Sequence, residues 1–287
     1  MPVVQRFDGS TWTSQPAGSG QPEDLSCGGP SSCMTTWGGF GSFNSRHWNG
    51  TSWQDLPTVN NMAVGAITGL SCPTATWCLA QSSDFGSATG DLAFVWSGGT
   101  SWTVLPPLPE NSGTATGVSC SAPGHCVVIT DWIAPILYRL NGSTWTAVPN
   151  TGLDVTNLGD ITDISCTGPG ECVAVGRKGY DDDSNPIGLL AVLRNGTWTS
   201  TIRPDRNLLS VDCASADSCV AVGSSSITSG AHVDRWDGSS WREVEVAPGL
   251  SELLDVSCGA PGTCEVVGRF ADGDTRSVVS RLVLDDD

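Results

Sequence analysis

Residues Asp163–Gly176 read D-I-S-C-T-G-P-G-E-C-V-A-V-G, and this pattern recurs so that the chain carries six copies. In every copy five residues separate the two cysteines. The six pairs are Cys27 with Cys33, Cys72 with Cys78, Cys120 with Cys126, Cys166 with Cys172, Cys213 with Cys219, and Cys258 with Cys264. Their first cysteines lie 45, 48, 46, 47 and 45 residues apart, and a fixed period in this range indicates a repeat architecture.

A second motif keeps step with the cysteine pairs. It consists of a Gly-containing turn, usually Asn-Gly or Asp-Gly, followed closely by Trp. Its copies are Phe7–Trp12, Trp48–Trp53, Trp96–Trp102, Leu140–Trp145, Arg194–Trp198 and Trp236–Trp241. Asn-Gly and Asp-Gly between two apolar runs are strong signals for a β-hairpin, so we expect a two-stranded hairpin at each copy.

The fourth unit supplies a template for the whole chain. Its expected strands are Asp163–Cys166, Cys172–Gly176, Gly188–Arg194 and Thr197–Arg203. Arg177–Pro186 is expected to be a polar loop between the second and third strands. Four short strands per unit without a helical period predict an all-β, six-bladed β-propeller with four-stranded blades, formed by residues 1–287 as a single domain.

The two ends of the chain each hold part of a unit. Val3–Pro16 contains a third-type strand and a Trp strand, whereas Leu253–Leu284 contains the first three strands without a Trp strand. We therefore expect the N-terminal strand to close the last blade and remove its free edge. Both Val3–Phe7 and Ser277–Leu284 have the character of the third strand, and the sequence does not decide between them.

The Trp motif resembles that of a known class of propellers. Asp8-Gly9-Ser10-Thr11-Trp12 and Asp237-Gly238-Ser239-Ser240-Trp241 match the core of the Asp-box pattern, although the upstream Ser is absent. The chain thus resembles β-propellers with Asp-box or kelch-like repeats, and bacterial secreted propeller lectins among them. The resemblance implies the architecture over the whole chain, but the motif is structural and does not imply a reaction.

Twelve cysteines in six equal pairs favour one disulfide per unit. Zinc is the competing interpretation, but zinc sites favour closer spacing such as C-x2-C, and only His125 lies inside a pair. Disulfides indicate an oxidising compartment, so we expect a secreted, extracellular protein. Met1-Pro2-Val3 leads directly into a predicted strand without a signal peptide, and we therefore interpret the sequence as a mature region.

The charge of the chain argues against some classes of partner. The formal net charge is -17, which repels phosphate backbones and anionic lipid surfaces, so nucleic-acid binding is not expected. No apolar run reaches the length of a membrane span, and membrane insertion is not expected either. The single lysine against twelve arginines, with many Gly, Ala and Ser residues, suggests a bacterial gene.

The expected strand directions divide the molecule into two faces. Turns between strands one and two and between strands three and four share one face, where the recurring cysteines and Asx-Gly turns lie. The loops that differ from unit to unit share the other face, and divergent loops on rigid strands are where sites are usually built. On that face an aromatic residue stands beside a polar or charged one in most units, a pattern that suits the stacking and hydroxyl contacts of a sugar. The predicted ligand contacts are Trp37, Phe85, Asp131, Trp132, Arg177, Tyr180, Arg269 and Phe270.

Other chemistry is less well supported by the residues. Asp181, Asp182 and Asp183 form the densest carboxylate cluster and could bind calcium, but their spacing matches no calcium loop, so a solvated acidic loop is the preferred interpretation and no cofactor is expected. Asp24, Asp163 and Asp255 stand three residues before a cysteine, and Asp212 stands one residue before. These carboxylates could bind a cation or a polar ligand in the central channel, but capping of backbone amides near a solvated axis is the preferred interpretation. There is no G-x-S-x-G motif and no unpaired cysteine to act as a nucleophile.

Three functional hypotheses follow from these patterns. The first is a secreted propeller that binds carbohydrate or another cell-surface ligand on its variable face. The second is an enzyme that acts on glycans or a small metabolite in the central pocket. The third is a protein-interaction module in a larger secreted assembly.

Overall fold

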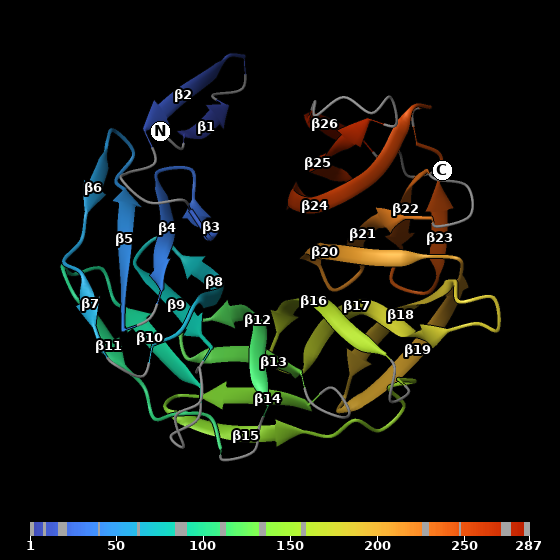
Figure 1. The fold of residues 1–287 in the computed structure, drawn as a ribbon, viewed down its shortest axis with the longest axis horizontal. Helices are drawn as coiled ribbons and strands as arrows, with labels where there is room; N and C mark the ends of the chain where they lie inside the picture. The colour runs from blue at the N-terminus through green and yellow to red at the C-terminus, as the bar shows by residue number, and fades with distance from the viewer. Residues whose placement is uncertain are drawn as a thin grey trace.

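The computed structural model describes residues 3–7, 10–16, 22–39, 41–61, 64–83, 91–109, 113–131, 136–155, 159–225, 230–246, 248–270 and 277–283. Within these ranges the regular secondary structure is entirely β-strand, arranged as seven antiparallel sheets around a common centre (Figure 1). Six of the sheets carry one cysteine pair each, and we name them blades one to six in chain order.

Five of the blades have at least four strands, which we name a, b, c and d from the centre outward. Blade one is β3 (Asp24–Gly29), β4 (Ser32–Gly39), β5 (Ser42–Trp48) and β6 (Trp53–Asp55), with the short β7 (Val59–Asn60) also paired to β5. Blade two is β8 (Ile67–Thr74), β9 (Trp77–Ser82), β10 (Leu92–Trp96) and β11 (Trp102–Val104). Blade three is β12 (Thr114–Ala122), β13 (His125–Asp131), β14 (Ile136–Asn141) and β15 (Thr144–Val148).

The second half of the chain repeats this order. Blade four is β16 (Asp160–Gly168), β17 (Glu171–Tyr180), β18 (Pro186–Arg194) and β19 (Thr197–Pro204). Blade five is β20 (Asn207–Ser215), β21 (Ser218–Ser224), β22 (Ala231–Trp236) and β23 (Trp241–Val244). Blade six has only β24 (Leu250–Ala260), β25 (Thr263–Phe270) and β26 (Ser277–Val283).

All six predicted disulfides are present, one in each blade. From blade one to blade six they join Cys27 to Cys33, Cys72 to Cys78, Cys120 to Cys126, Cys166 to Cys172, Cys213 to Cys219, and Cys258 to Cys264. Each bond connects strands a and b, and the Cα atoms of a bonded pair lie 3.9–4.1 Å apart in every blade. No cysteine is left free to bind zinc. The five-residue spacing therefore encodes a tight a–b hairpin that its own disulfide closes.

The core lies between neighbouring blades, because side chains of a strand alternate between its two faces. In blade four Val173, Val175 and Leu190 face forward and pack with Val211 and other residues of blade five. Residues on the opposite face of blade four, such as Leu189, pack with blade three. Each blade therefore needs a neighbour on both sides to bury its apolar residues.

The strands of blade four are longer than the sequence predicts. The a–b and b–c pairings continue to Arg177 and Tyr180, so the expected ten-residue loop shrinks to a turn over residues 181–185. Arg177 and Tyr180 thus lie on strand β17 rather than in a loop. The polar composition of the segment concealed the strand, since pairing with β18 satisfies its backbone and only its side chains meet solvent.

The predicted completion of the last blade by the N-terminal strand is not formed in this structure. β1 (Val3–Phe7) and β2 (Trp12–Pro16) pair with each other in a separate two-stranded sheet. In the described part of blade six, β26 takes the third place and is the outer edge strand. Figure 1 shows the resulting seam between β24–β26 and the N-terminal strands β1–β3.

Candidate functional site at the loop end of blade four

Strand β17 connects the two faces of the molecule. Cys172 stands near its beginning and Tyr180 at its end, eight residues later, which corresponds to about 26 Å of extended strand. The disulfide and the b–c turn of blade four therefore lie at opposite ends of the sheet. This geometry agrees with the predicted separation of a repeated face from a variable face.

Arg177 and Tyr180 are brought together at the loop end of β17. The Arg177 guanidinium donates two hydrogen bonds, of 3.0 and 2.5 Å, to the two carboxylate oxygens of Asp160 on β16. Its Nη1 donates to the Tyr180 hydroxyl at 2.8 Å, and its Cζ lies 5.3 Å from the centroid of the Tyr180 ring. The hydrogen bond and the charge of Asp160 raise the pKa of Arg177. Arg177 and Asp160 thus hold Tyr180, which is 45% exposed, in one orientation.

A β-bulge turns the neighbouring cation away from this group. The register shifts between Arg177 and Gly179, which leaves Lys178 as the extra residue. Lys178 Nζ pairs instead with Asp154 Oδ2 at 2.6 Å. The bulge therefore spreads two adjacent positive charges over two separate carboxylates on the surface.

The turn after Tyr180 is built around Asp181. Its carboxylate accepts hydrogen bonds from the backbone N–H groups of Asp183 at 3.0 Å and Asn185 at 2.8 Å. The Asn185 side-chain amide also donates to it, and these contacts, led by the Asn185 backbone, lower the pKa of Asp181. Ser184 has the left-handed φ of 66°. The Asp181 carboxylate thus stabilises the turn that follows it.

The calcium hypothesis for Asp181, Asp182 and Asp183 stays a prediction. Over the described ranges, no group of three or more His, Cys, Asp or Glu side chains has the arrangement of a metal site. A calcium ion would have to compete with the backbone amides that already occupy the Asp181 carboxylate.

A polar cluster beside this turn was not predicted from the sequence. Arg203 Nε donates to Asp234 Oδ1 at 2.9 Å, and this carboxylate is only 2% exposed. Glu243 Oε1 accepts from Arg206 Nη2 at 3.0 Å and lies 3.1 Å from His232 Nδ1. Burial, followed by the charge of Arg206, lowers the pKa of His232. The cluster joins blades four and five at the loop face, and only the density of charge over residues 203–206 hinted at it.

The remaining predicted contacts are distributed over other blades. Asp131 ends β13, is exposed, and accepts a hydrogen bond from the Thr114 N–H at 2.8 Å. Arg269 Nη1 pairs with Glu252 Oε1 at 3.1 Å, and the half-buried Phe270 follows it at the end of β25. Trp37 on β4 is 8% exposed and belongs to the core. Phe85 and Trp132 lie outside the described residues.

The centre of the array is lined by the a strands of all six blades and encloses a cavity of about 300 Å³. Asp163 Oδ2 accepts from the Val211 N–H at 2.9 Å, and Asp24 Oδ2 accepts from the Leu70 N–H at 2.8 Å. These are the predicted caps on backbone amides. Burial raises the pKa of Asp24 to about 6 and that of Asp163 to about 7.

Ser210 links two of these axial carboxyl groups. Its Oγ lies 2.9 Å from Asp163 Oδ2 and 2.7 Å from Asp255 Oδ1. A hydroxyl has one proton to donate, so a protonated Asp163 that donates to Ser210 satisfies both contacts. The axial polar groups are thus engaged with one another and with the backbone of the next blade.

The structure also bears on membrane crossing by helices. Within the described ranges, no helix has the length and apolar character needed to span a bilayer.

Comparisons with known proteins identify the fold but not a family. No protein-family model matches the sequence, and no curated protein matches it. Among solved structures, the WD40 β-propeller domain of Doa1 aligns with a TM-score of 0.62 at 14% identity, over 93% of this chain and 82% of that one. The Aleuria aurantia lectin in complex with Fucα1-6GlcNAc aligns with a TM-score of 0.53 at 12% identity, over 91% and 95%.

A third similar structure is a much longer enzyme. The GH74 xyloglucanase of Xanthomonas campestris aligns with a TM-score of 0.61 at 11% identity. The alignment covers 90% of this chain but only 44% of that chain. At these identities the similarities establish a propeller-like all-β fold, in agreement with the repeat pattern.

Proposed function

We propose that this protein is a secreted propeller that binds carbohydrate, or another polar cell-surface ligand, at the loop face. The observation that carries the proposal is the Tyr180 ring, which is exposed yet fixed by Arg177 and Asp160. A fixed aromatic ring offers a surface on which the C–H face of a sugar can stack. The cationic and carboxylate groups beside it offer hydrogen-bond partners for the sugar hydroxyls, and their fixed positions lower the entropic cost of binding. The sugar-bound lectin of similar fold adds support by analogy only.

The other predicted contacts have different parts in this proposal. Asp131, Arg269 and Phe270 would form weaker contacts on other blades, and several such contacts would add avidity for a multivalent ligand. Trp37 would support strand β4 from the core. Phe85 and Trp132 keep the contact role that the sequence predicts for them.

The six disulfides support the proposed location. They indicate an oxidising compartment, where such bonds form and persist. We infer secretion to the cell exterior, and mass analysis of the natural protein in culture medium would test it.

The binding proposal is tested with a glycan array, with fucosylated oligosaccharides as the first probes. We expect binding by the natural chain and at least a tenfold loss for Tyr180→Ala. Asp182→Ala is the matched control, because it removes a neighbouring carboxylate that, among the described residues, makes no hydrogen bond or ion pair to Arg177, Tyr180 or Asp160. No bound glycan in the array, or equal binding by Tyr180→Ala, would refute a sugar site at this turn.

We further propose that the blades form a closed six-bladed ring whose last blade is completed by N-terminal residues. The support is the count of strands: the described residues hold six a, six b and six d strands, enough for six complete blades. Closure would also give blades one and six the second neighbour that every other blade has.

A further inference from the structure

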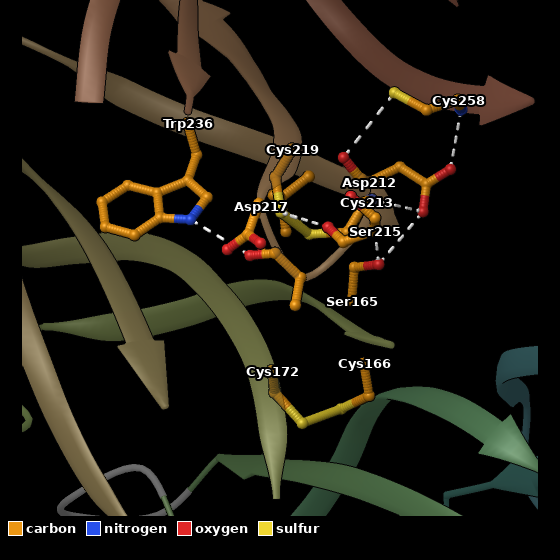
Figure 2. Close-up of a disulfide and its surroundings, with 12 residues drawn as sticks. Ser165, Cys166, Cys172, Asp212, Cys213, Ser215, Asp217, Cys219, Trp236 and Cys258 are labelled. Atoms are coloured by element: carbon orange, nitrogen blue, oxygen red, sulfur yellow. Dashed lines mark hydrogen bonds between the residues drawn. A yellow bond between two sulfur atoms is a disulfide. The ribbon is translucent and has the colours of Figure 1, made fainter. Parts of the chain in front are cut away.

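Five of the contacts between neighbouring blades contain the same hydrogen bond. The residue before the first cysteine of one blade accepts from the N–H of the first cysteine of the next. The five bonds are Ser26–Cys72 at 3.0 Å, Ser71–Cys120 at 3.0 Å, Ser119–Cys166 at 2.9 Å, Ser165–Cys213 at 3.1 Å and Asp212–Cys258 at 2.7 Å. Figure 2 shows the last two, in which Ser165 lies beside Cys213 and Asp212 lies beside Cys258. A sixth bond of this series would join Ser257 to the N–H of Cys27.

The seam exposes apolar residues whose counterparts are buried between blades one and two and between blades five and six. Leu25 is 48% exposed, whereas Leu70, its equivalent two residues before the first cysteine of blade two, is 6% exposed. On the opposite side Val279 is 44% exposed, whereas Val233 at the same place in blade five is 0% exposed. A cavity of about 620 Å³ opens between the two sides and is lined by Leu25, Cys27 and Ser257 among others. The two faces of the seam are thus the two halves of one ordinary blade interface.

The described residues hold one c strand more than six blades require. Residues 3–7 read V-V-Q-R-F and residues 278–282 read V-V-S-R-L, so the first and last c strands are close copies. In β26 the pairs Glu265↔Arg281 and Val267↔Val279 set the register with β25. The equivalent residues of β1 are Arg6 and Val4, which preserve both the charge pair and the apolar contact.

The β1–β2 hairpin already sits beside blade one as an outer pair of strands. The Arg6 guanidinium lies 5.3 Å from the ring centroid of Trp48, the last residue of a c strand. Its counterpart in blade one, His47, packs against the equivalent Trp96 of blade two, with ring centroids 4.6 Å apart. Arg46 Nη1 also donates to the Pro16 carbonyl at 2.8 Å. The hairpin therefore occupies the place that the c and d strands of the closing blade need.

We propose that the ring closes by strand exchange, in which β1 replaces β26 on the outer edge of β25. Blade six then consists of β24, β25, β1 and β2, and Ser257 Oγ accepts the N–H of Cys27 as the sixth bond of the series. Asp255 lies where it accepts the N–H of Leu25, as Asp24 accepts that of Leu70 and Asp163 that of Val211. The displaced residues 277–283 leave the sheet. This inference rests on the six-bladed ring proposed above and is independent of the ligand.

Two matched pairs of substitutions in the full chain test the proposal by thermal unfolding. Leu25→Ala is compared with Leu70→Ala: in a closed ring both lower Tm, by about 5 °C or more. Val4→Thr is compared with Val279→Thr, an isosteric change that places a hydroxyl where a buried methyl stood. Strand exchange predicts that Val4→Thr lowers Tm by about 3 °C or more, while Val279→Thr leaves it unchanged.

Each of the other outcomes would refute one part of the proposal. A Tm unchanged by Leu25→Ala, with a clear loss for Leu70→Ala, would overturn the six-bladed ring itself. If Val279→Thr lowers Tm and Val4→Thr does not, or if both change Tm equally, the strand exchange is refuted. The six-bladed ring is still supported in both cases if Leu25→Ala lowers Tm.

Hydrogen exchange and light scattering complete the test without a substitution. Closure by exchange predicts that the amides of residues 24–27 exchange as slowly as those of residues 69–72, and that residues 277–283 exchange fast. Protection of residues 277–283 instead would contradict it. A dimer mass in light scattering would show that β1 pairs with a second copy, which would overturn closure within one chain.

Discussion

The cysteine end and the loop end of blade four are built from the same two strands, β16 and β17, but they differ in how far they are repeated in the other blades. At the cysteine end, Cys166 and Cys172 are buried in the core between blades three and four, and the arrangement recurs in all six blades. At the loop end, the Arg177–Asp160 pair has a counterpart in the Arg269–Glu252 pair of blade six, but the sequence repeats Tyr180 in no other blade. The difference indicates that stability is built by repetition and that recognition is built where the repeat is released.

The axial and loop carboxylates of the same blade show a parallel contrast. Burial raises the pKa of Asp163, while hydrogen bonds from the Asn185 backbone and its neighbours lower that of the exposed Asp181. One residue type thus serves opposite purposes, since desolvation disfavours the charged form and donated hydrogen bonds favour it.

Removal of one disulfide should have the largest effect. We expect Cys166→Ala with Cys172→Ala to lower the free energy of unfolding by about 2.4 kcal/mol, because the cross-link no longer restricts the unfolded chain. Urea unfolding measures the loss. Ligand affinity at low temperature should be retained. A variant that folds normally but does not bind would contradict the view that the cysteine end is framework and the loop end is the binding site.

The pH dependence of stability should follow Asp163. In the unfolded chain an Asp loses its proton near pH 4, whereas folded Asp163 holds its proton up to a pKa of about 7. The unfolded state therefore binds fewer protons between these values, and the free energy of unfolding falls as pH rises from about 4 to about 7. Asp24, with a pKa of about 6, acts in the same direction.

Asp163→Asn should remove the larger part of this slope. We expect the difference in unfolding free energy between pH 5 and pH 8 to shrink by about 2 kcal/mol, with allowance for relaxation around a buried charge. Asp131→Asn at the loop face is the control. A slope that Asp163→Asn leaves unaltered would mean that this carboxyl is ionised in the folded protein at pH 5.

Arg177→Ala should change binding far more than stability. Its pair with Asp160 is partly exposed, with 27% and 43% of the two side chains accessible, so the loss should stay below about 1 kcal/mol. Affinity should fall about tenfold because the Tyr180 ring loses its fixed orientation. Calorimetry with Lys178→Ala as control measures both effects, and equal losses for the two variants would point to charge rather than ring orientation.

Asp181→Ala should have the smallest effect on stability, since the turn is exposed. The amides of Asp183 and Asn185 lose their acceptor and should exchange faster with solvent. Asp182→Ala should leave these amides unchanged. The same spectra with millimolar calcium test the metal hypothesis: shifts at residues 181–183 would support calcium binding, and unchanged spectra would refute it.

Much of the framework could be predicted because it is local and repeated. When two short strands turn back at once, the five-residue spacing places Cys166 and Cys172 directly opposite each other, so pairing and disulfide follow together. The Asp237 turn follows from its own sequence too, since its carboxylate accepts the N–H groups of Ser239 and Ser240. Each of these features depends on residues close together in the chain.

The site was only partly predictable for the opposite reason. Arg177 and Tyr180 were recognised as candidates, but Asp160, which orients them, comes from the preceding strand and is an ordinary acidic residue in the sequence. Arg203 and Asp234 meet across two blades and are separated by 31 residues. Trp37 looked like a surface aromatic, yet the b strand of blade one continues through it and turns its ring into the core.

The sequence by itself determined the repeat, the disulfides and the polarity of each blade, because these depend on spacing and on the alternation of side chains along a strand. Only the tertiary structure decided which side chains meet between blades, and how the ends of the chain are arranged. V-V-Q-R-F and V-V-S-R-L are equally good c strands, so their order in the chain cannot choose between them. That choice depends on which neighbour each strand buries, and a neighbour exists only once the blades are assembled.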